Sequence, residues 1–565
     1  MKNIFSILLN IILINYFIVN AQDNNTSLTV SSSENPFCTS LSVNTTFDTG
    51  TIIPQLLCVP ILSYEPDRIL LTWNKPDENS NGQESEDSKE LIVTTPSNYK
   101  NVIDITDIGA IGDGQTLNTK LIQKAIDQCI IGSTSAFDCK VYIPKGTFLT
   151  GAIILHSNMT LELGFGAILL GSNNSNDYPI LKSLNIPSAL INVIDPLHSK
   201  NIRIVGNGII DGNGWKLNKT INDEIGNSLP IYFKGSAKTI SQLGVLAKNQ
   251  VEKSGTNTYS SSRSKLVLLL GITNLHVGGN LTFRNPSMIT ISIGNSQNIS
   301  IINNRFHTFD INNGDGINLG ASSNVQILNN FFETGDDAIA MGTGQGARSN
   351  SLPVEGVVIR NNYFRHSHGC SCGGYTGDWI QDILIEDNIF ILSNNGLRIK
   401  STTKTGGGVR RLLFRNAGIK AVGCTNNFNY NGQILNGNTI NGYPLIFTLK
   451  YKDGNNNFPP AKIPTVYSYI TITNVGIDGI KPTKSSGVIL IDGNQITKYF
   501  HNNFVLSNMN IKNVIPAKIS QLRKSIFDNL IFKNFAGSNP FSFKQCKGLK
   551  FSNIPNLINP QNNYT

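Results

Sequence analysis

The sequence predicts an all-β protein built as a right-handed parallel β-helix, a solenoid, with a capping helix at its N-terminal end. The first observation is a pattern of alternating apolar residues, a fixed Asn and a closing Phe, which recurs in segments 298–306, 324–332, 356–364 and 382–390. The second is a short apolar strand after each segment. Coils that bury their apolar face only by stacking on the next coil form a solenoid. A β-sandwich with Asn-rich turns is the alternative, but it gives no reason for Asn and Phe to repeat in one register.

The repeats also predict which side chains stack. The asparagines at the fixed place are Asn304, Asn330, Asn362 and Asn388. We expect them to form a ladder that satisfies backbone groups at the turns. In the second strands, the residues expected to align inward are Ile317, Ile339, Cys370 and Ile399.

A helical pattern precedes the repeats. Apolar residues recur at helical spacing at Leu117, Leu121, Ile122, Ala125, Ile126 and Cys129. A solenoid needs such a cap because its first coil would otherwise expose an apolar face. The β-helix domain is therefore predicted over residues 101–551, with an extended loop at 216–262 and a tail at 552–565.

The N-terminal part of the chain differs from the repeats. Residues 1–21 combine a basic start, an apolar run and a small-residue cleavage pattern, which predicts a secretory signal peptide. A membrane anchor is the alternative, but the run is short and two asparagines interrupt it. Residues 22–100 are predicted to be an N-terminal extension with an acidic linker at 74–90. Segment 68–76 is faintly similar to one strand of a fibronectin type III domain.

Composition limits the possible partners. The chain has 565 residues, of which 15% are charged, with a net charge of +9 and a pI near 9.0. A solenoid of this length is possible because it grows in one dimension. The positive balance favours anionic partners, but no nucleic-acid module or dense basic run is present. We therefore expect a secreted, extracellular protein that is monomeric and, once mature, bound to neither membrane nor nucleic acid.

Eight cysteines in a secreted chain permit disulfides. Cys38 with Cys58 and Cys129 with Cys139 are the plausible local pairs. Cys370 and Cys372 fall at inward positions, where two buried thiols are at least as plausible as a bridge. Nine glycosylation sequons occur, at Asn24, Asn25, Asn44, Asn158, Asn173, Asn218, Asn280, Asn298 and Asn563.

Three carboxylates recur in matching positions of consecutive repeats. Asp315 follows Asn313-Gly314, and Asp336 and Asp337 follow Gly335. Adjacent strands lie about 4.8 Å apart, so stacking brings these acids into one cluster. Crowding opposes the ionisation of all three, and at least one can hold a proton well above its free pKa. The alternative is that they are ordinary turn aspartates next to glycine.

Two features of local geometry follow. Adjacent Asp336 and Asp337 cannot both face one groove from an ideal strand, which predicts a bend at Gly335. Arg398 and Lys400 flank an inward residue, so both point outward on one face, where they can pair with a uronate carboxylate. A carboxylate cluster beside two cations is the equipment of a hydrolase that acts on an acidic sugar.

At these residues the chain resembles family 28 of the glycoside hydrolases, the polygalacturonases and related pectin hydrolases. The resemblance spans roughly residues 102–551. Its specific part is four motifs in family order: Asn313-Gly314-Asp315, Gly335-Asp336-Asp337, His368-Gly369 and Arg398-Ile399-Lys400.

The resemblance implies roles for these residues. Asp336 is implied to be the general acid, and Asp315 and Asp337 to hold and deprotonate water in an inverting reaction. His368 is implied to help set their protonation. The implied substrate-binding residues are Asn313, Arg398, Lys400 and Tyr451. No metal or cofactor is implied, and the expected partner is an anionic polysaccharide, pectin or polygalacturonate, cleaved at α-1,4-galacturonosyl linkages.

The chain departs from the family pattern at two places beside the groove. Residues 370–375 read Cys-Ser-Cys-Gly-Gly-Tyr, and Gly314 stands where Thr is more common. These departures put subsite preference in doubt. The alternatives are a pectate lyase, a rhamnogalacturonan or xylogalacturonan hydrolase, and a non-catalytic solenoid. The sequence does not decide between endo and exo cleavage.

Overall fold

The computed structural model describes two sets of residues. In the N-terminal part these are 28–31, 69–73, 91–93 and 99. In the remainder they are 101–132, 139–194, 199–222, 228–230, 245–254, 262–308, 311, 313–349, 351–420, 422, 427–430, 433–436, 443–451, 457–479, 487–555 and 557.

The chain divides into two compact units. The first comprises residues 1–42 and 56–99, and the second residues 43–55 and 100–565. In the first, β1 (Leu28–Ser31), β2 (Ile69–Trp73) and β3 (Leu91–Val93) form an antiparallel sheet with β2 in the middle. The strand of segment 68–76 is thus a central strand. The signal peptide, the acidic linker, Cys38 with Cys58 and the first three sequons lie outside the described residues.

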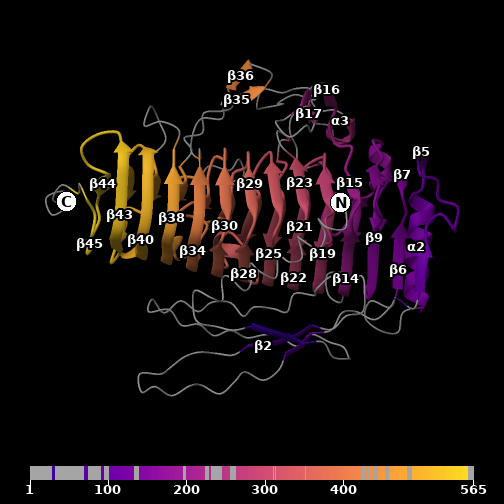
Figure 1. The fold of residues 1–565 in the computed structure, drawn as a ribbon, viewed down its shortest axis with the longest axis horizontal. Coiled ribbons are helices and arrows are strands. Elements are labelled where there is room, and N and C mark those ends of the chain that lie inside the picture. Colours follow the sequence, from indigo (N-terminus) through magenta and orange to yellow (C-terminus); the bar gives the residue numbers. More distant parts are fainter. Residues whose placement is uncertain are drawn as a thin grey trace. The chain divides into compact units, whose positions relative to one another are not determined.

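The second unit is a right-handed parallel β-helix, as predicted (Figure 1). One of its sheets has twelve strands, each paired in parallel with the next. In chain order they are β8 (Ile153–Ile154), β13 (Ile191–Val193), β18 (Val267–Leu270), β21 (Ile291–Gly294), β24 (Ile317–Gly320), β27 (Ile339–Thr343), β30 (Cys370–Thr376), β33 (Leu397–Lys400), β37 (Leu445–Thr448), β39 (Ile489–Asp492), β41 (Ala517–Ser520) and β44 (Phe541–Lys544).

The other large sheet holds the remaining strands of the coil, again in parallel pairs. They are β4 (Asn101–Asp104), β5 (Asp113–Leu117), β6 (Cys139–Ile143), β7 (Gly146–Thr150), β9 (Met159–Leu163), β10 (Ala167–Gly171), β14 (Ser199–Gly206), β15 (Ile209–Asp211), β19 (Ile272–Gly278), β20 (Thr282–Arg284), β22 (Gln297–Ile302), β23 (Arg305–Thr308), β25 (Ser323–Leu328), β26 (Phe331–Thr334), β28 (Val354–Arg360), β29 (Tyr363–Arg365), β31 (Ile380–Glu386), β32 (Ile389–Ile391), β34 (Gly408–Lys420), β38 (Val466–Asp478), β40 (His501–Val514), β42 (Leu522–Arg523), β43 (Ile526–Phe535) and β45 (Lys550–Ser552).

The predicted asparagine ladder is confirmed. Asn330 Oδ1 accepts from the Asn304 backbone N–H at 2.9 Å and from the Asn304 amide at 3.1 Å. Asn362 Oδ1 accepts the same two hydrogen bonds from Asn330, and Asn388 Oδ1 accepts them from Asn362. All four side chains are buried, so the ladder satisfies backbone groups that water cannot reach.

The closing phenylalanines also stack. Phe306, Phe332, Phe364 and Phe390 form a continuous column whose ring centroids lie 4.5–5.1 Å apart. The inward register differs from the prediction at one position. Cys370 pairs with Leu397, while Ile399 pairs with Cys372. All four side chains are fully buried, so Ile399 points inward as predicted. The pairing of β33 is nevertheless shifted by two residues from the predicted register.

The N-terminal cap is helix α2 (Thr119–Gly132), which covers the first coils. Its apolar face buries Ile122, Ala125 and Ile126 in the core. The predicted Cys129–Cys139 disulfide ties the helix to β6. Cys370 and Cys372 are buried free thiols, which settles the alternative in favour of thiols.

Segment 216–262 is not the plain extended loop that the sequence predicts. It contains the hairpin of β16 (Leu217–Asn222) with β17 (Ser228–Pro230) and helix α3 (Val245–Lys253). Figure 1 shows α3 and this hairpin at the same edge of the coil as a second hairpin, β35 (Asn427–Tyr430) with β36 (Gln433–Asn436). The helix forms because Leu246, Ala247 and Val251 share one buried face.

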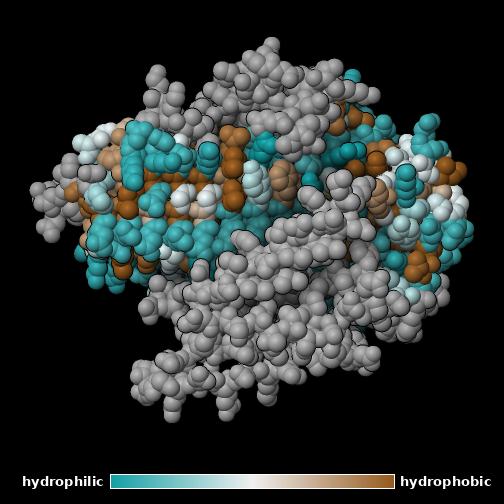
Figure 2. Space-filling model, in the orientation of Figure 1, coloured by the Kyte–Doolittle hydropathy of each residue, from teal (hydrophilic) through white to brown (hydrophobic). Residues whose placement is uncertain are grey.

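Short elements complete the unit. They are β11 (Ile180–Leu181) with β12 (Ile186–Pro187), and the 3₁₀ turns η1 (Ser175–Asp177), η3 (Gly346–Arg348) and η4 (Thr497–Tyr499). Figure 2 shows hydrophilic residues over most of the coloured surface, with apolar residues between them along the C-terminal coils. No helix among the described residues is long and apolar enough to cross a membrane.

Candidate active site

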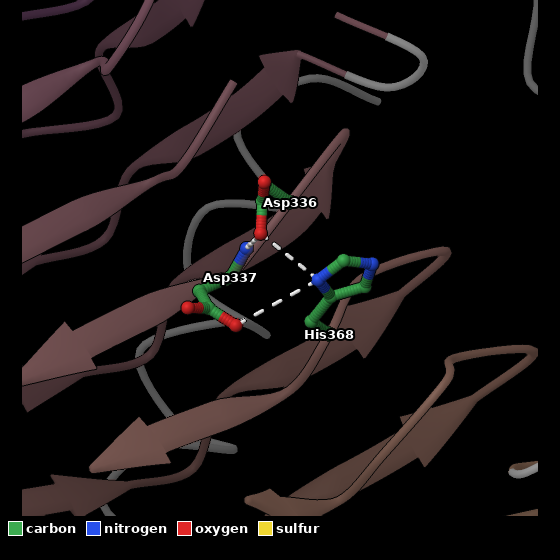
Figure 3. Close-up of side chains that lie close together, drawn as sticks. All are labelled: Asp336, Asp337 and His368. Atoms are coloured by element: carbon green, nitrogen blue, oxygen red, sulfur yellow. Dashed lines mark hydrogen bonds and ion pairs between the residues drawn. The ribbon is translucent and has the colours of Figure 1, made fainter. Parts of the chain in front are cut away.

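The bend predicted at Gly335 separates strand β26 from strand β27 and presents both neighbouring acids (Figure 3). A Cβ atom on Gly335 would overlap the Ile311 carbonyl oxygen, so the chain can approach that closely only with glycine. The Thr334 hydroxyl donates to the Asp336 carbonyl oxygen at 2.9 Å and fixes the bend. Asp336 and Asp337 thereby both reach His368, as Figure 3 shows.

Asp337 is held as a carboxylate by two cations. Lys400 Nζ donates to its Oδ2 at 2.6 Å, and Arg398 Nη1 to its Oδ1 at 3.4 Å. The Ser371 hydroxyl also donates to Oδ1, at 2.6 Å. Burial alone would raise the pKa of Asp337, but Lys400 and then Arg398 outweigh it and hold the pKa below its ordinary value.

Asp336 is the most exposed of the three acids. Its side chain is 26% exposed, against 5% for Asp337. Its Oδ1 accepts the Asp337 backbone N–H at 2.9 Å and lies 2.9 Å from His368 Nδ1. Burial alone would raise the pKa of Asp336, but His368 above all, with Lys400 and Arg398, holds the pKa below its ordinary value.

Asp315 differs from the other two acids in its protonation. Burial, followed by the negative charges of Asp336 and Asp337, raises the pKa of Asp315 well above its ordinary value. Lys400 and a hydrogen bond with Asn318 act in the opposite direction without cancelling this effect. The cluster therefore holds a proton on Asp315 under conditions in which Asp337 is ionised, as the crowding of the acids predicts.

Two groups converge on His368 Nδ1. Asp336 Oδ1 lies 2.9 Å away and Arg398 Nη1 lies 3.2 Å away. A guanidinium only donates, so its bond requires Nδ1 to be free of a proton. Asp336 can then hydrogen-bond to Nδ1 only as the protonated acid. When Nδ1 carries the proton instead, Asp336 accepts it as a carboxylate and the Arg398 bond is lost.

The two cations of the Arg-Ile-Lys motif share a neighbour. Lys400 Nζ lies 4.9 Å from the Tyr451 ring centroid and Arg398 Cζ lies 5.7 Å from it. Burial alone would lower the pKa of Lys400, but Asp337 outweighs burial and raises it. The Lys400 side chain is 6% exposed and that of Arg398 is 14% exposed. Arg398 is therefore the more accessible of the two to a ligand.

Asn313 completes the set of predicted residues. Its Nδ2 lies 3.5 Å from Asp336 Oδ2, and its Oδ1 accepts from Arg263 Nη2 at 2.9 Å. The backbone of Asn313 has a φ of 53°, a left-handed conformation that Asn tolerates. The structure thus gathers every predicted site residue into one cluster.

Two residues in contact with this cluster were not assigned a role from the sequence. Ser371 lies between two inward cysteines, so strand alternation places its side chain outward, beside Asp337, and this signal could have been used. Arg263 follows the 216–262 insertion, where no repeat pattern indicates its register. Nothing in its local sequence distinguishes it from a surface arginine.

Asp336, Asp337 and His368 offer ligand atoms within 4.8 Å of one another, the spacing of a possible metal site. The donor set does not fit a divalent cation well. Lys400 and Arg398 already place two positive charges on Asp337, and a metal ion at the same oxygens would be repelled by both. Protein cations supply the charge compensation at this site.

Comparison with known proteins places this cluster in a family. The model of glycosyl hydrolases family 28 matches residues 134–512. The chain is 40% identical over 493 residues to an exo-poly-alpha-D-galacturonosidase of Dickeya chrysanthemi, covering 83% of this chain and 77% of that relative. It is 27% identical to a probable polygalacturonase of Vitis vinifera, covering 62% and 67% respectively.

Solved structures agree. A family 28 exopolygalacturonase of Yersinia enterocolitica has a TM-score of 0.72 and 38% identity, with 86% of this chain and 83% of that chain covered. A polygalacturonase of Erwinia carotovora, at 19% identity and a TM-score of 0.51 with 79% and 96% covered, shares the fold. The resemblance found in the motifs is confirmed. The chain belongs to family 28 of the glycosyl hydrolases and is a glycosidase of the polygalacturonase type.

Proposed function

We propose that this protein hydrolyses the α-1,4-galacturonosyl linkages of polygalacturonate with inversion, releasing sugar from a chain end. The observation that carries the proposal is one cluster in which Asp337 is a carboxylate bound to two cations and Asp336 is a second, more exposed carboxyl group beside it. Acid–base hydrolysis of a glycoside uses such a pair of carboxyl groups, one as base and one as acid. The 40% identical relative, an exo-poly-alpha-D-galacturonosidase, supports both the substrate and the exo mode.

Asp336 is assigned as the general acid. It is the acid whose side chain reaches solvent most freely, so a glycosidic oxygen in the groove can contact it. In the free enzyme its pKa is low, so a proton must be favoured there when substrate binds. Two changes act in that direction: substrate excludes water, and its uronate carboxylates bring negative charge next to Asp336. When Arg398 donates to His368 Nδ1, Asp336 can keep its own hydrogen bond to Nδ1 only in the protonated form, so this state also favours the acid.

Asp337 is assigned as the general base. Its contacts with Lys400 and Ser371 keep it ionised and fix its orientation toward an attacking water. Asp315 holds that water from the neighbouring coil. Asp315 and Asp337 lie side by side on neighbouring coils, because each stands two residues before a paired residue, Ile317 and Ile339 respectively. Inversion requires the base and the acid to stand on opposite faces of the sugar.

Arg398 is assigned to the uronate carboxylate, with Tyr451 beside it. The guanidinium offers several donors in a planar fork and is less buried than the Lys400 ammonium. Lys400 also adds positive potential to the groove. Its short bond to Asp337 indicates that its main role is to keep the general base ionised. The protein is further proposed to act outside the cell, on the evidence of its N-terminal sequence.

The deciding experiment is incubation with polygalacturonate, with reducing ends, product sizes and anomeric configuration followed by nuclear magnetic resonance. Monomer or dimer released from the start, with inverted configuration, supports the proposal, and a ladder of intermediate oligomers refutes the exo mode. An Asp336→Asn variant should lose at least about a hundredfold in turnover while staying folded. Ultraviolet absorbance of unsaturated products that chelator abolishes would instead identify a lyase.

A further inference from the structure

An arginine from outside the family motifs lies against the acid cluster. Arg263 is 2% exposed, and its guanidinium lies 5.8 Å from the centroid of the Trp215 ring. Its Nη2 donates to Asn313 Oδ1 at 2.9 Å, and its Nη1 donates to the Ser287 carbonyl oxygen at 3.1 Å. Asn313 in turn contacts Asp336. Arg263 is therefore one residue removed from the proposed general acid.

The chemistry of these three groups fixes their orientation. A guanidinium can only donate, so the oxygen of the Asn313 amide must face Arg263. The amide nitrogen then faces Asp336 Oδ2, at 3.5 Å. If the amide turned over, the nitrogen would oppose a guanidinium and the oxygen would oppose a carboxylate, two unfavourable contacts. Arg263 thus selects the rotamer in which Asn313 presents donors to Asp336.

The arginine is itself held by the insertion. The Gln250 side chain of helix α3 accepts from the Ser264 backbone N–H at 2.8 Å and from the Ser287 hydroxyl at 3.0 Å, and it donates to the Ser264 hydroxyl. Ser264 follows Arg263 in the chain, and Ser287 carries the carbonyl that Arg263 binds. Gln250 is buried, so these bonds are shielded from water.

We propose that Arg263 is a positioning residue for catalysis, which acts by orienting Asn313 toward Asp336 and which helix α3 holds in place through Gln250. This inference rests on the assignment of Asp336 as the general acid. Asn313 donors stabilise the carboxylate that Asp336 becomes once it has given its proton to the leaving oxygen. The insertion at 216–262, which is outside the repeats, is in this way connected to the reaction.

The inference makes a directional prediction about pH. Without the oriented amide, the carboxylate form of Asp336 loses a donor, so its pKa rises. Asp336 must be protonated to act as the acid. The alkaline limb of the pH–activity profile, where activity falls as pH rises, should therefore move to higher pH. At the optimum the rate falls because the developing carboxylate is less stabilised. The bond to the carboxylate is long, at 3.5 Å, so we expect it to contribute about 0.5–1.5 kcal/mol, which corresponds to a loss of about three- to tenfold.

The test compares Arg263→Met, Arg263→Lys and Gln250→Leu with the parent enzyme on polygalacturonate. For Arg263→Met we expect kcat about three- to tenfold lower, KM little changed, and the alkaline limb moved up by as much as about one pH unit. Arg263→Lys, which can still donate to Asn313, should restore part of the rate. Gln250→Leu, which keeps the arginine, should shift the limb in the same direction but less.

The matched control is Arg284→Met. Arg284 Nε donates to Asp211 Oδ2 at 2.6 Å on the neighbouring strand, and among the described residues this bond does not involve the acid cluster. The substitution should therefore lower stability without moving the alkaline limb. An unmoved limb in folded Arg263→Met, or the same shift in Arg284→Met, overturns the inference.

A second readout separates this inference from the proposed function. A nitrophenyl galacturonide has a good leaving group that needs little protonation, so acid catalysis matters less for it. Arg263→Met and Asp336→Asn should both lose less on this substrate than on polygalacturonate. If Asp336→Asn shows this pattern and Arg263→Met loses equally on both substrates, Arg263 is structural and the acid assignment stands. If Asp336→Asn retains wild-type turnover, the acid assignment fails and the inference fails with it.

Discussion

Replacing Lys400 by methionine tests which partner the ammonium serves. The structure places Nζ 2.6 Å from Asp337 Oδ2, and the side chains of Lys400 and Asp337 are 6% and 5% exposed. Methionine keeps much of the apolar stem and removes the charge. Because Lys400 is the strongest influence that lowers the pKa of Asp337, its loss should raise that pKa. Asp337 must be ionised to accept a proton from water, so the acid limb of the activity profile should move to higher pH.

The size of the effect follows from the bond that is lost. A hydrogen bond to a charged group is worth about 1.5–3 kcal/mol. That energy corresponds to a shift of the limb by about one to two pH units, and to a loss of about ten- to a hundredfold below it. The folded state should also be destabilised at neutral pH, because Asp337 would remain buried without its cation. This destabilisation should shrink in acid, where the carboxyl takes up a proton.

The assay is kcat and kcat/KM across pH on polygalacturonate and on partly methyl-esterified pectin. The loss should be similar on both substrates, because it arises at the base and not at the uronate. Arg398→Met is the comparison, and its loss should shrink on the esterified substrate. An unchanged acid limb for Lys400→Met, with a loss confined to the charged substrate, would show that Lys400 reads the uronate directly.

Three further predictions concern the fold around the site. Asp315→Asn should stabilise the protein above about pH 4, since the raised pKa of Asp315 means that ionising it costs folding free energy, and thermal unfolding across pH should show the gain vanish in acid. Cys372→Val should cost under about 1.5 kcal/mol in a denaturant titration, because the swap conserves volume in the core, and a larger loss would point to a specific role for the thiol. Asn362→Leu should cost about 2–5 kcal/mol in the same titration, because it leaves the Ile327 carbonyl and the Asn330 N–H unpaired. As a control, Asn510→Ala at an exposed position should leave the free energy of unfolding nearly unchanged. A loss there as large as that of Asn362→Leu would contradict the ladder argument.

The coil could be predicted from the sequence because its signals are local and repeated. The asparagine and phenylalanine positions recur with each coil, and stacking alone converts them into a ladder and a column. The pairing of β33 was misplaced by two residues because such a shift leaves every side chain on the same face. An alternating pattern distinguishes the faces of a strand but not the register of its pairs.

The site could be predicted only in part for a related reason. Motif order located the acids, and alternation placed Lys400 on their side of the sheet. Neither could show that the ammonium bonds to Asp337, because that depends on distances between coils. Helix α3 was missed because its segment is rich in polar residues and only a few apolar side chains form its buried face. Arg263, which depends on that helix, was missed with it.

The stacking that builds the coil also explains why the acids differ. Rows of identical residues stabilise a β-helix when they are apolar, but a row of carboxylates repels. Here the cations lie on β33, two strands beyond β27 in the sheet, and Asp337 lies two residues before the start of β27. Asp315 precedes β24, one strand farther from the cations, and receives less of their field. The acid nearer the cations is ionised and the farther one keeps a proton. Position along the row, set by the register of the coils, thus gives chemically identical side chains unequal pKa values. Asp337, the proposed base, is kept ionised, while Asp315, which is proposed to hold the water, keeps a proton.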